Sequence, residues 1–176
     1  MRRWKKVVGG TGGSEIAEAA LVLPIAFMIL LAIYWFGRAF NIYGTINHAA
    51  REGAQIGMAQ TCANCTPGNA PPPIGTIATR VAQALQASHI DSTKITVIVA
   101  PVYTGCAGAA PVCSSSSNIW VCTNVQMVTV PPASSGTPAC GTTVDFQYPY
   151  QVVLPFTSIS NQAFQLPAHV QMRSEQ

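Results

Sequence analysis

A run of apolar side chains near the start of the chain is the strongest pattern in the sequence. Within the stretch Ser14 to Gln60, no charged residue occurs between Ala19 and Phe36, a span of eighteen residues. At about 1.5 Å per residue, a helix of this length is roughly 27 Å long, close to the hydrocarbon thickness of a bilayer. The pattern therefore predicts a membrane-spanning helix, with the rest of the chain as a head carried by that helix.

The apolar run continues without a break into an amphipathic helical pattern. A polar stripe recurs at spacings of three and four residues: Arg38, Asn41, Thr45, His48, Glu52 and Gln55. Apolar side chains flank this stripe on both sides: Phe36, Phe40, Tyr43, Ala50 and Ala54 on one, and Ile42, Ile46, Ala49, Gly53 and Ile56 on the other. Because more than half of the circumference is apolar, this half of the helix must pack on its own head, on partner helices, or on both. The spacing Gly53-x-x-x-Gly57 suits close contact between helices.

The C-terminal part of the chain carries the patterns of a small α+β head. Residues 61–73 form a turn-rich linker. The spacing of Ile74, Ile77, Val81 and Leu85 predicts a short helix over residues 74–88. Strands are expected at residues 94–100, 118–130, 142–154 and 166–172, with loops at 104–117 and 131–141. We therefore expect an antiparallel sheet with the short helix packed on its apolar face.

The clearest strand alternation lies in residues 142–154. One face is expected to carry Val144, Phe146, Tyr148, Tyr150 and Val152, and the other Thr143, Asp145, Gln147 and Gln151. Pro149 cannot donate to a strand ladder, which indicates an edge position or a bulge. The isolated acids Asp91 and Asp145 are expected at the surface or in turns.

Charge is distributed unevenly along the chain. The net charge is +3, but Arg2, Arg3, Lys5 and Lys6 all precede the apolar run. Beyond Gly53 the basic and acidic residues balance, so the head has no basic face for nucleic acid. Short basic flanks stay on the cytoplasmic side of a membrane. The pattern thus predicts a cytoplasmic N-terminus and a head on the other side.

The first residues and the first acids each allow two interpretations. Residues 1–13 are either a disordered cytoplasmic tail or a leader that a peptidase removes, and the apolar run is too long for an ordinary secretory signal. Glu15 and Glu18 either favour the positive end of the helix dipole, or Glu18 enters the apolar layer and needs a cationic partner. Pro24 frees one helical carbonyl and permits a local kink.

Six cysteines follow the apolar run, and this even number on the exported side indicates disulfides. They are Cys62, Cys65, Cys106, Cys113, Cys122 and Cys140. Fifteen pairings are possible, and we expect pairing of sequential neighbours. The other interpretation is a metal or redox site at Cys62-x-x-Cys65, but the sequence lacks the second CxxC or the HxxxH that a zinc site needs.

Motifs of catalysis are missing from the sequence. It has no P-loop, HExxH or GxSxG pattern, and its histidines at positions 48, 89 and 169 fall on different predicted elements. We therefore expect no enzymatic activity, no cofactor and no metal.

Three separate motifs of this chain resemble those of the TadE-like family, the minor pseudopilins of tight-adherence (Flp) pilus systems, which are relatives of type IV pilins. They are GSEIAEAALVLP over residues 13–24, FGRAF over residues 36–40 and NHAAREGA over residues 47–54. The ending AHVQMRSE, residues 168–175, is similar to the terminal strand of that family. Ala19 departs from the family pattern, which usually has an aromatic residue at that place.

The resemblance implies how the chain is processed and where it works. A prepilin peptidase would cut between Gly13 and Ser14, which places Glu18 at the fifth position of the mature chain. Glu18, Pro24, Gly53 and Gly57 would then serve subunit assembly. The expected organisation is a leader (1–13), a pilin-like helix (14–60), a linker (61–73) and a periplasmic head (74–176). The implied partners are the peptidase, other minor pilins, the major pilin, the inner-membrane assembly platform and membrane lipid.

Two hypotheses from different classes follow. In the first, the chain is a structural minor pilin that is anchored in the inner membrane and then enters or primes a pilus. In the second, it is a bitopic membrane protein whose disulfide-bonded head binds a ligand or performs thiol chemistry. Cleavage before Ser14 is expected only from the first.

Overall fold

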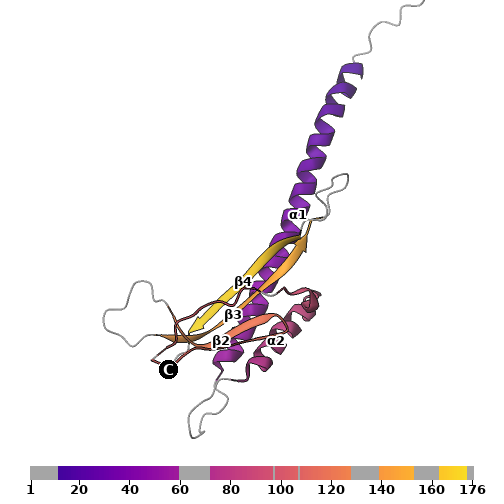
Figure 1. Ribbon diagram of the computed structural model, residues 1–176. Helices are drawn as coiled ribbons and strands as arrows, with labels where there is room; N and C mark the ends of the chain where they lie inside the picture. The colour runs from indigo at the N-terminus through magenta and orange to yellow at the C-terminus, as the bar shows by residue number, and fades with distance from the viewer. Residues whose placement is uncertain are drawn as a thin grey trace, which may run out of the picture. The chain divides into compact units, whose positions relative to one another are not determined.

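The described part of the chain folds into two helices, a short 3-10 helix and one antiparallel sheet (Figure 1). The computed structural model describes residues 12–59, 72–96, 98–106, 108–127, 139–152 and 163–173. Their elements, in chain order, are α1 (Gly12–Met58), α2 (Ile74–Ala87), the 3-10 helix η1 (Ser92–Lys94), β1 (Val112–Ser116), β2 (Ile119–Gln126), β3 (Cys140–Gln151) and β4 (Ala163–Arg173). The expected α+β class, with a long N-terminal helix before an antiparallel sheet and one further helix, is confirmed.

Contacts divide the chain into two compact units. The first ends at Arg38, and the second runs from Ala39 to Gln176. The second half of α1 therefore belongs with the head, as its amphipathic pattern requires. Pro24 lies within the first unit, inside the helix.

The sheet is a meander in which each strand pairs with the next one along the chain. Its order is β1-β2-β3-β4, and all pairs are antiparallel. Ser117 and Asn118 join β1 to β2 with φ of 52° and 63°. Two consecutive left-handed residues give the turn whose twist suits a two-residue hairpin. The register of β2 against β3 shifts between Cys122 and Val125, where Asn124 is also left-handed.

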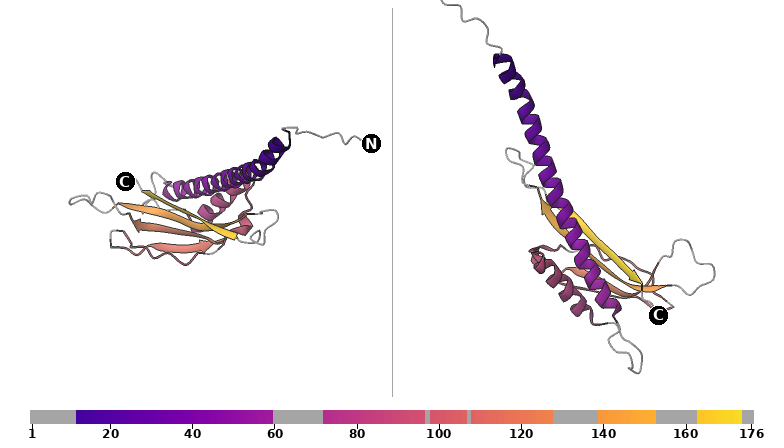
Figure 2. Two further views of the ribbon diagram at one scale, coloured as in Figure 1. Left: turned by 90° about the horizontal axis from the view of Figure 1, so that it is seen from above. Right: turned by 180° about the vertical axis from the view of Figure 1, so that it is seen from behind.

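Helix α2 and the second half of α1 cover one face of the sheet (Figure 2, left view). The core contains Ile46 and Ala50 of α1, Ile77 and Val81 of α2, and Phe146 of β3, each at most 1% exposed. The predicted apolar face of the short helix is confirmed, since Ile77, Val81 and Leu85 are buried and Ile74 packs against the core. The predicted final strand is also confirmed, with Ala168 and Val170 buried in β4.

Two predictions for the strands were wrong. Residues 112–116, expected within a loop, form strand β1, because the hairpin turn at Ser117–Asn118 returns them against β2. The described part of 94–100, expected as a strand, makes only one bridge, from Thr96 to Gln147. Its β-branched pattern does not correspond to burial, since Val99 is 94% exposed. The linker at 61–71 and most of the loop at 131–141 lie outside the described residues.

Strand β3 is buried on both faces over part of its length. The predicted apolar face is confirmed by Val144, Phe146, Tyr148 and Tyr150, which are at most 9% exposed. Thr143 and Asp145, on the other face, are 0% and 6% exposed. The expectation of a surface or turn position for Asp145 was therefore wrong, whereas Asp91 is exposed as expected. Asp91 caps the N-terminus of η1, where the hydroxyl and the amide of Thr93 donate to its carboxylate and lower the pKa of that group.

Candidate functional site

The first unit presents a helix surface that is almost entirely apolar and exposed. Between Ile16 and Phe36 the large apolar side chains Leu21, Leu23, Met28 and Leu30 are 63–70% exposed. The candidate span Ile16–Met58 has a mean hydropathy of 2.6 in its most apolar window, and none of that window is buried. Exposed apolar patches of this size mark a membrane or protein contact. Within the described residues this helix alone has the length and composition to cross a membrane.

Charged and aromatic side chains delimit this apolar stretch at both ends. Glu18 is exposed near its beginning, and the next charged residue is Arg38. The nineteen residues between them span about 28 Å of helix, enough for the hydrocarbon core. At the far end the Tyr34 and Trp35 rings meet edge to face, and the Arg38 guanidinium lies 5.9 Å from the Trp35 ring centroid. Tyrosine, tryptophan and arginine gather where hydrocarbon meets water.

The predicted cleavage site lies at the start of α1. The helix begins at Gly12, so the Gly13–Ser14 bond belongs to its first turn, and Glu18 follows about one turn after Ser14. Residues 1–11 of the predicted leader lie outside the described residues.

Gly53 and Gly57 make their contacts inside the head. A Cβ on Gly53 would meet Val81 Cγ2 of α2 at 2.3 Å, and one on Gly57 would meet Thr142 Cγ2 of β3 at 2.8 Å. Only the missing side chains let α1 come so close. The motif therefore serves close packing of α1 on α2 and on the sheet, and its part in subunit assembly stays a prediction.

The flank with the isoleucines packs on the head, whereas the flank with the aromatic residues is buried only at Ala50 and Ala54. Ile46, Ala49, Ala50 and Ala54 are buried in the core, and Ile42 and Ile56 pack against it. Phe40 and Tyr43 are 70% and 45% exposed. His48 and Glu52 pair at 3.4 Å on the exposed polar stripe. Part of the helix thus packs on its own head, and the aromatic side chains Phe40 and Tyr43 remain exposed.

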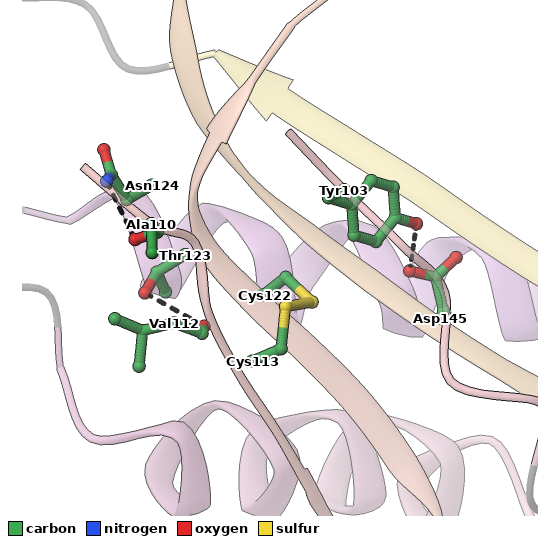
Figure 3. The surroundings of a disulfide bond; sticks show 8 residues. All are labelled: Tyr103, Ala110, Val112, Cys113, Cys122, Thr123, Asn124 and Asp145. Atoms are coloured by element: carbon green, nitrogen blue, oxygen red, sulfur yellow. Dashed lines mark hydrogen bonds between the residues drawn. A yellow bond between two sulfur atoms is a disulfide. The ribbon is translucent and has the colours of Figure 1, made fainter. Parts of the chain in front are cut away.

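Tyr103, Asp145 and His169 form a polar cluster on the sheet face opposite the helices. This cluster was not predicted from the sequence. Tyr103 donates its hydroxyl to Asp145 Oδ2 at 2.7 Å (Figure 3). His169 of β4 donates from Nδ1 to the other oxygen of the same carboxylate, which can only accept. Burial, reinforced by the bond to Asp145, raises the pKa of Tyr103 well above its ordinary value. The cluster ties the segment before β1 and the last strand to β3, and it explains why a carboxylate can be buried here.

Among the described residues, two disulfides hold the head, and their pairing corrects the expectation of sequential neighbours. Cys106 bonds Cys140, and Cys113 bonds Cys122 (Figure 3 shows the second). Cys113 and Cys122 are register partners in the β1–β2 hairpin, so strand pairing sets this choice. Cys106 lies beside β2, where its amide donates to the Asn124 carbonyl at 3.1 Å, and β2 in turn pairs with the start of β3 at Cys140. Cys62 and Cys65 lie outside the described residues.

The described residues do not form a metal-binding site. Among them, no three His, Cys, Asp or Glu side chains gather closely enough to hold a metal ion. The most distinctive feature of the chain is therefore the exposed apolar helix with Glu18 near its start.

These features define the class of α+β proteins in which one long, exposed apolar helix precedes a small head. Residues 13–55 match the family described as TadE-like protein, which is the family that the sequence motifs resemble. The match covers the candidate span, Glu18 and Gly53, and it ends within the second half of α1. Comparisons with curated proteins and with solved structures give no match.

Proposed function

We propose that this chain is a minor pseudopilin that takes part in assembly of a tight-adherence (Flp) type IV pilus, with a structural and non-enzymatic role. The observation that carries the proposal is the exposed apolar helix of residues 16–36, which lies within the TadE-like match and has one carboxylate near its start. Such a helix can be stored in the inner membrane and later packed among the helices of other pilins, since both surroundings are apolar.

The proposed topology places the N-terminus in the cytoplasm and the head in the periplasm. The four basic residues before the helix support this orientation. The two disulfides of the head support it independently, because disulfides persist in oxidising compartments outside the cytoplasm. The proposed partners are a prepilin peptidase that cuts before Ser14, other minor pilins with the major pilin, and the inner-membrane assembly platform.

Glu18 has a specific place in this proposal. A carboxylate that enters an apolar helix bundle needs an opposite charge, because an isolated buried ion is very costly. Cleavage before Ser14 creates an amine, and the amine of a neighbouring subunit would supply that charge. If Glu18 instead only favours the helix dipole, its removal would cost no more than about 1 kcal/mol of helix stability.

Glu18→Ala is therefore expected to leave membrane insertion intact and to lower recovery of the chain in sheared pili by at least tenfold. Loss of one partner from a buried ion pair typically costs about 3 kcal/mol or more, which exceeds a tenfold effect. The measurement is quantitative immunoblotting of membrane and pilus fractions from the native host.

The matched control for this experiment is Glu52→Ala, which removes an acid of the same helix that is exposed on the head and pairs with His48. The control should be recovered in pili as the wild type is. Normal recovery of the Glu18 variant would contradict the pairing role.

A further inference from the structure

Strands β3 and β4 continue as a two-stranded ribbon past the end of β2. Strand β2 pairs with β3 only from Cys140 to Asp145, whereas β4 pairs with it as far as Gln151. We call residues 146–151 of β3 and 163–168 of β4 the two-stranded ribbon. Among the described residues, only Thr96 bridges to β3 on the side that β2 has left, and none pairs with the outer side of β4. As far as the described residues go, both sides of the ribbon are therefore strand edges over most of their length.

The bridge at Thr96 fixes which way the backbone groups of the ribbon point. The Thr96 amide donates to the Gln147 carbonyl at 3.0 Å, so this carbonyl points away from β4. In an antiparallel pair of strands, the backbone N–H and C=O groups of two opposed residues either point toward each other or both point away from the partner strand. The two kinds of pair alternate along the strands. Gln147 and its partner Pro167 are therefore an outward-facing pair. Two residues further along, Pro149 and its partner Gln165 are the next such pair.

Each proline of the ribbon thus occupies a position where any other residue would offer an N–H at a free edge. Pro167 removes this donor from the outer edge of β4, and Pro149 removes it from the opposite edge on β3. Neither proline breaks a bond inside the ribbon, because the inward-facing pairs on either side keep theirs. Phe164 nevertheless stays 51% exposed on the ribbon, so the edge retains an apolar side chain that an added strand could cover.

We propose that Pro149 and Pro167 guard the two edges of the ribbon against strand addition by a second copy of this chain. An unguarded edge of uncharged, β-forming residues is a template for edge-to-edge association. The rest of each edge fits this description, since Phe164, Gln165 and Leu166 precede Pro167 without a charge. The two prolines thus disfavour association of copies through the sheet edges, so that copies associate through other surfaces. This inference does not depend on the proposed function.

The test restores the missing donor on one edge of the full-length chain in detergent micelles. Pro167→Val supplies an N–H that faces outward, between the outward amides of Gln165 and His169. We expect the self-association constant, measured by sedimentation equilibrium, to rise about fivefold or more, the factor that one net hydrogen bond gives. Hydrogen exchange at the amides of Gln165 and His169 should slow in the associated form. Pro149→Val tests the other edge in the same way, with slower exchange expected at Gln151.

The matched control is Gln171→Val, which places the same side chain on the same strand at an outward-facing position that already has its N–H. It should associate no more than the wild type. Association of Gln171→Val equal to that of Pro167→Val would assign the effect to side-chain hydrophobicity and overturn the proposal. Unchanged association of both proline variants would overturn it as well, since the prolines would then be tolerated at the edges without guarding them.

Discussion

Gly53→Val is expected to destabilise the head by about 3 kcal/mol, the upper part of the range for overpacked cores. The first added carbon would lie 2.3 Å from Val81 Cγ2. Val81 is fully buried and β-branched, so it can neither swing out into solvent nor change its rotamer freely. The helices α1 and α2 would have to separate, and the contacts of Ile77 would loosen with them. Urea unfolding of the full-length chain in micelles, followed by proteolysis of the unfolded head, measures the effect.

Gly44→Val is the matched control because it changes another glycine of the same helix half in the same way. A Cβ at Gly44 meets nothing within 4 Å, so valine should fit there. Its helix propensity exceeds that of glycine, and the stability should stay within about 0.5 kcal/mol of the wild type or rise slightly. Equal losses at the two glycines would show that α1 does not pack on α2 through Gly53.

Removal of the Cys106–Cys140 disulfide by a double alanine substitution is expected to cost about 3.8 kcal/mol, on the chain-entropy estimate for a loop of its size. The two cysteines are 34 residues apart, so the bond restricts a long stretch of the unfolded chain. It also holds Cys106, which is fully buried, beside β2 and the beginning of β3. Thermal unfolding of the oxidised variant and of the wild type in the same micelles measures the difference.

The double alanine variant of Cys113 and Cys122 is the natural comparison. These cysteines are only 9 residues apart, and the same estimate gives about 2.6 kcal/mol. The hairpin turn and the strand register already hold the two residues opposite each other. The smaller loss is therefore expected here, and a larger loss than for the first pair would contradict the entropic explanation.

Elements with a strong period could be predicted from the sequence. The apolar run and its amphipathic continuation indicated the long helix, and the spacing of Ile77, Val81 and Leu85 indicated α2, because both patterns extend over several turns. Strand β1 could not be predicted in this way. Its sequence, VCSSS, has no alternation, and it pairs with β2 because two left-handed residues make the turn. Conversely, the apolar run around Val99 has the composition of a strand, but among its described residues only Thr96 forms a bridge to a strand.

The candidate site was predictable where local sequence decides it, and not where the tertiary structure does. Glu18 is visible because a carboxylate beside an apolar run is rare. The contacts of Asp145 with Tyr103 and His169 join residues 42 and 24 positions apart, and no local pattern relates them. The disulfide pairing failed for a related reason. Proximity along the chain favoured sequential neighbours, whereas strand register and the position of Cys106 beside β2 decide the actual bonds.

The mass of the N-terminal peptide of the chain, purified from membranes of its native host, tests the central claim most directly. The account predicts a mature chain that begins at Ser14, with the basic residues 1–13 removed and the whole apolar helix retained. That result would place Glu18 at the position where the amine of a neighbouring subunit can reach it. An intact Met1, or a chain cut beyond Phe36, would contradict the account.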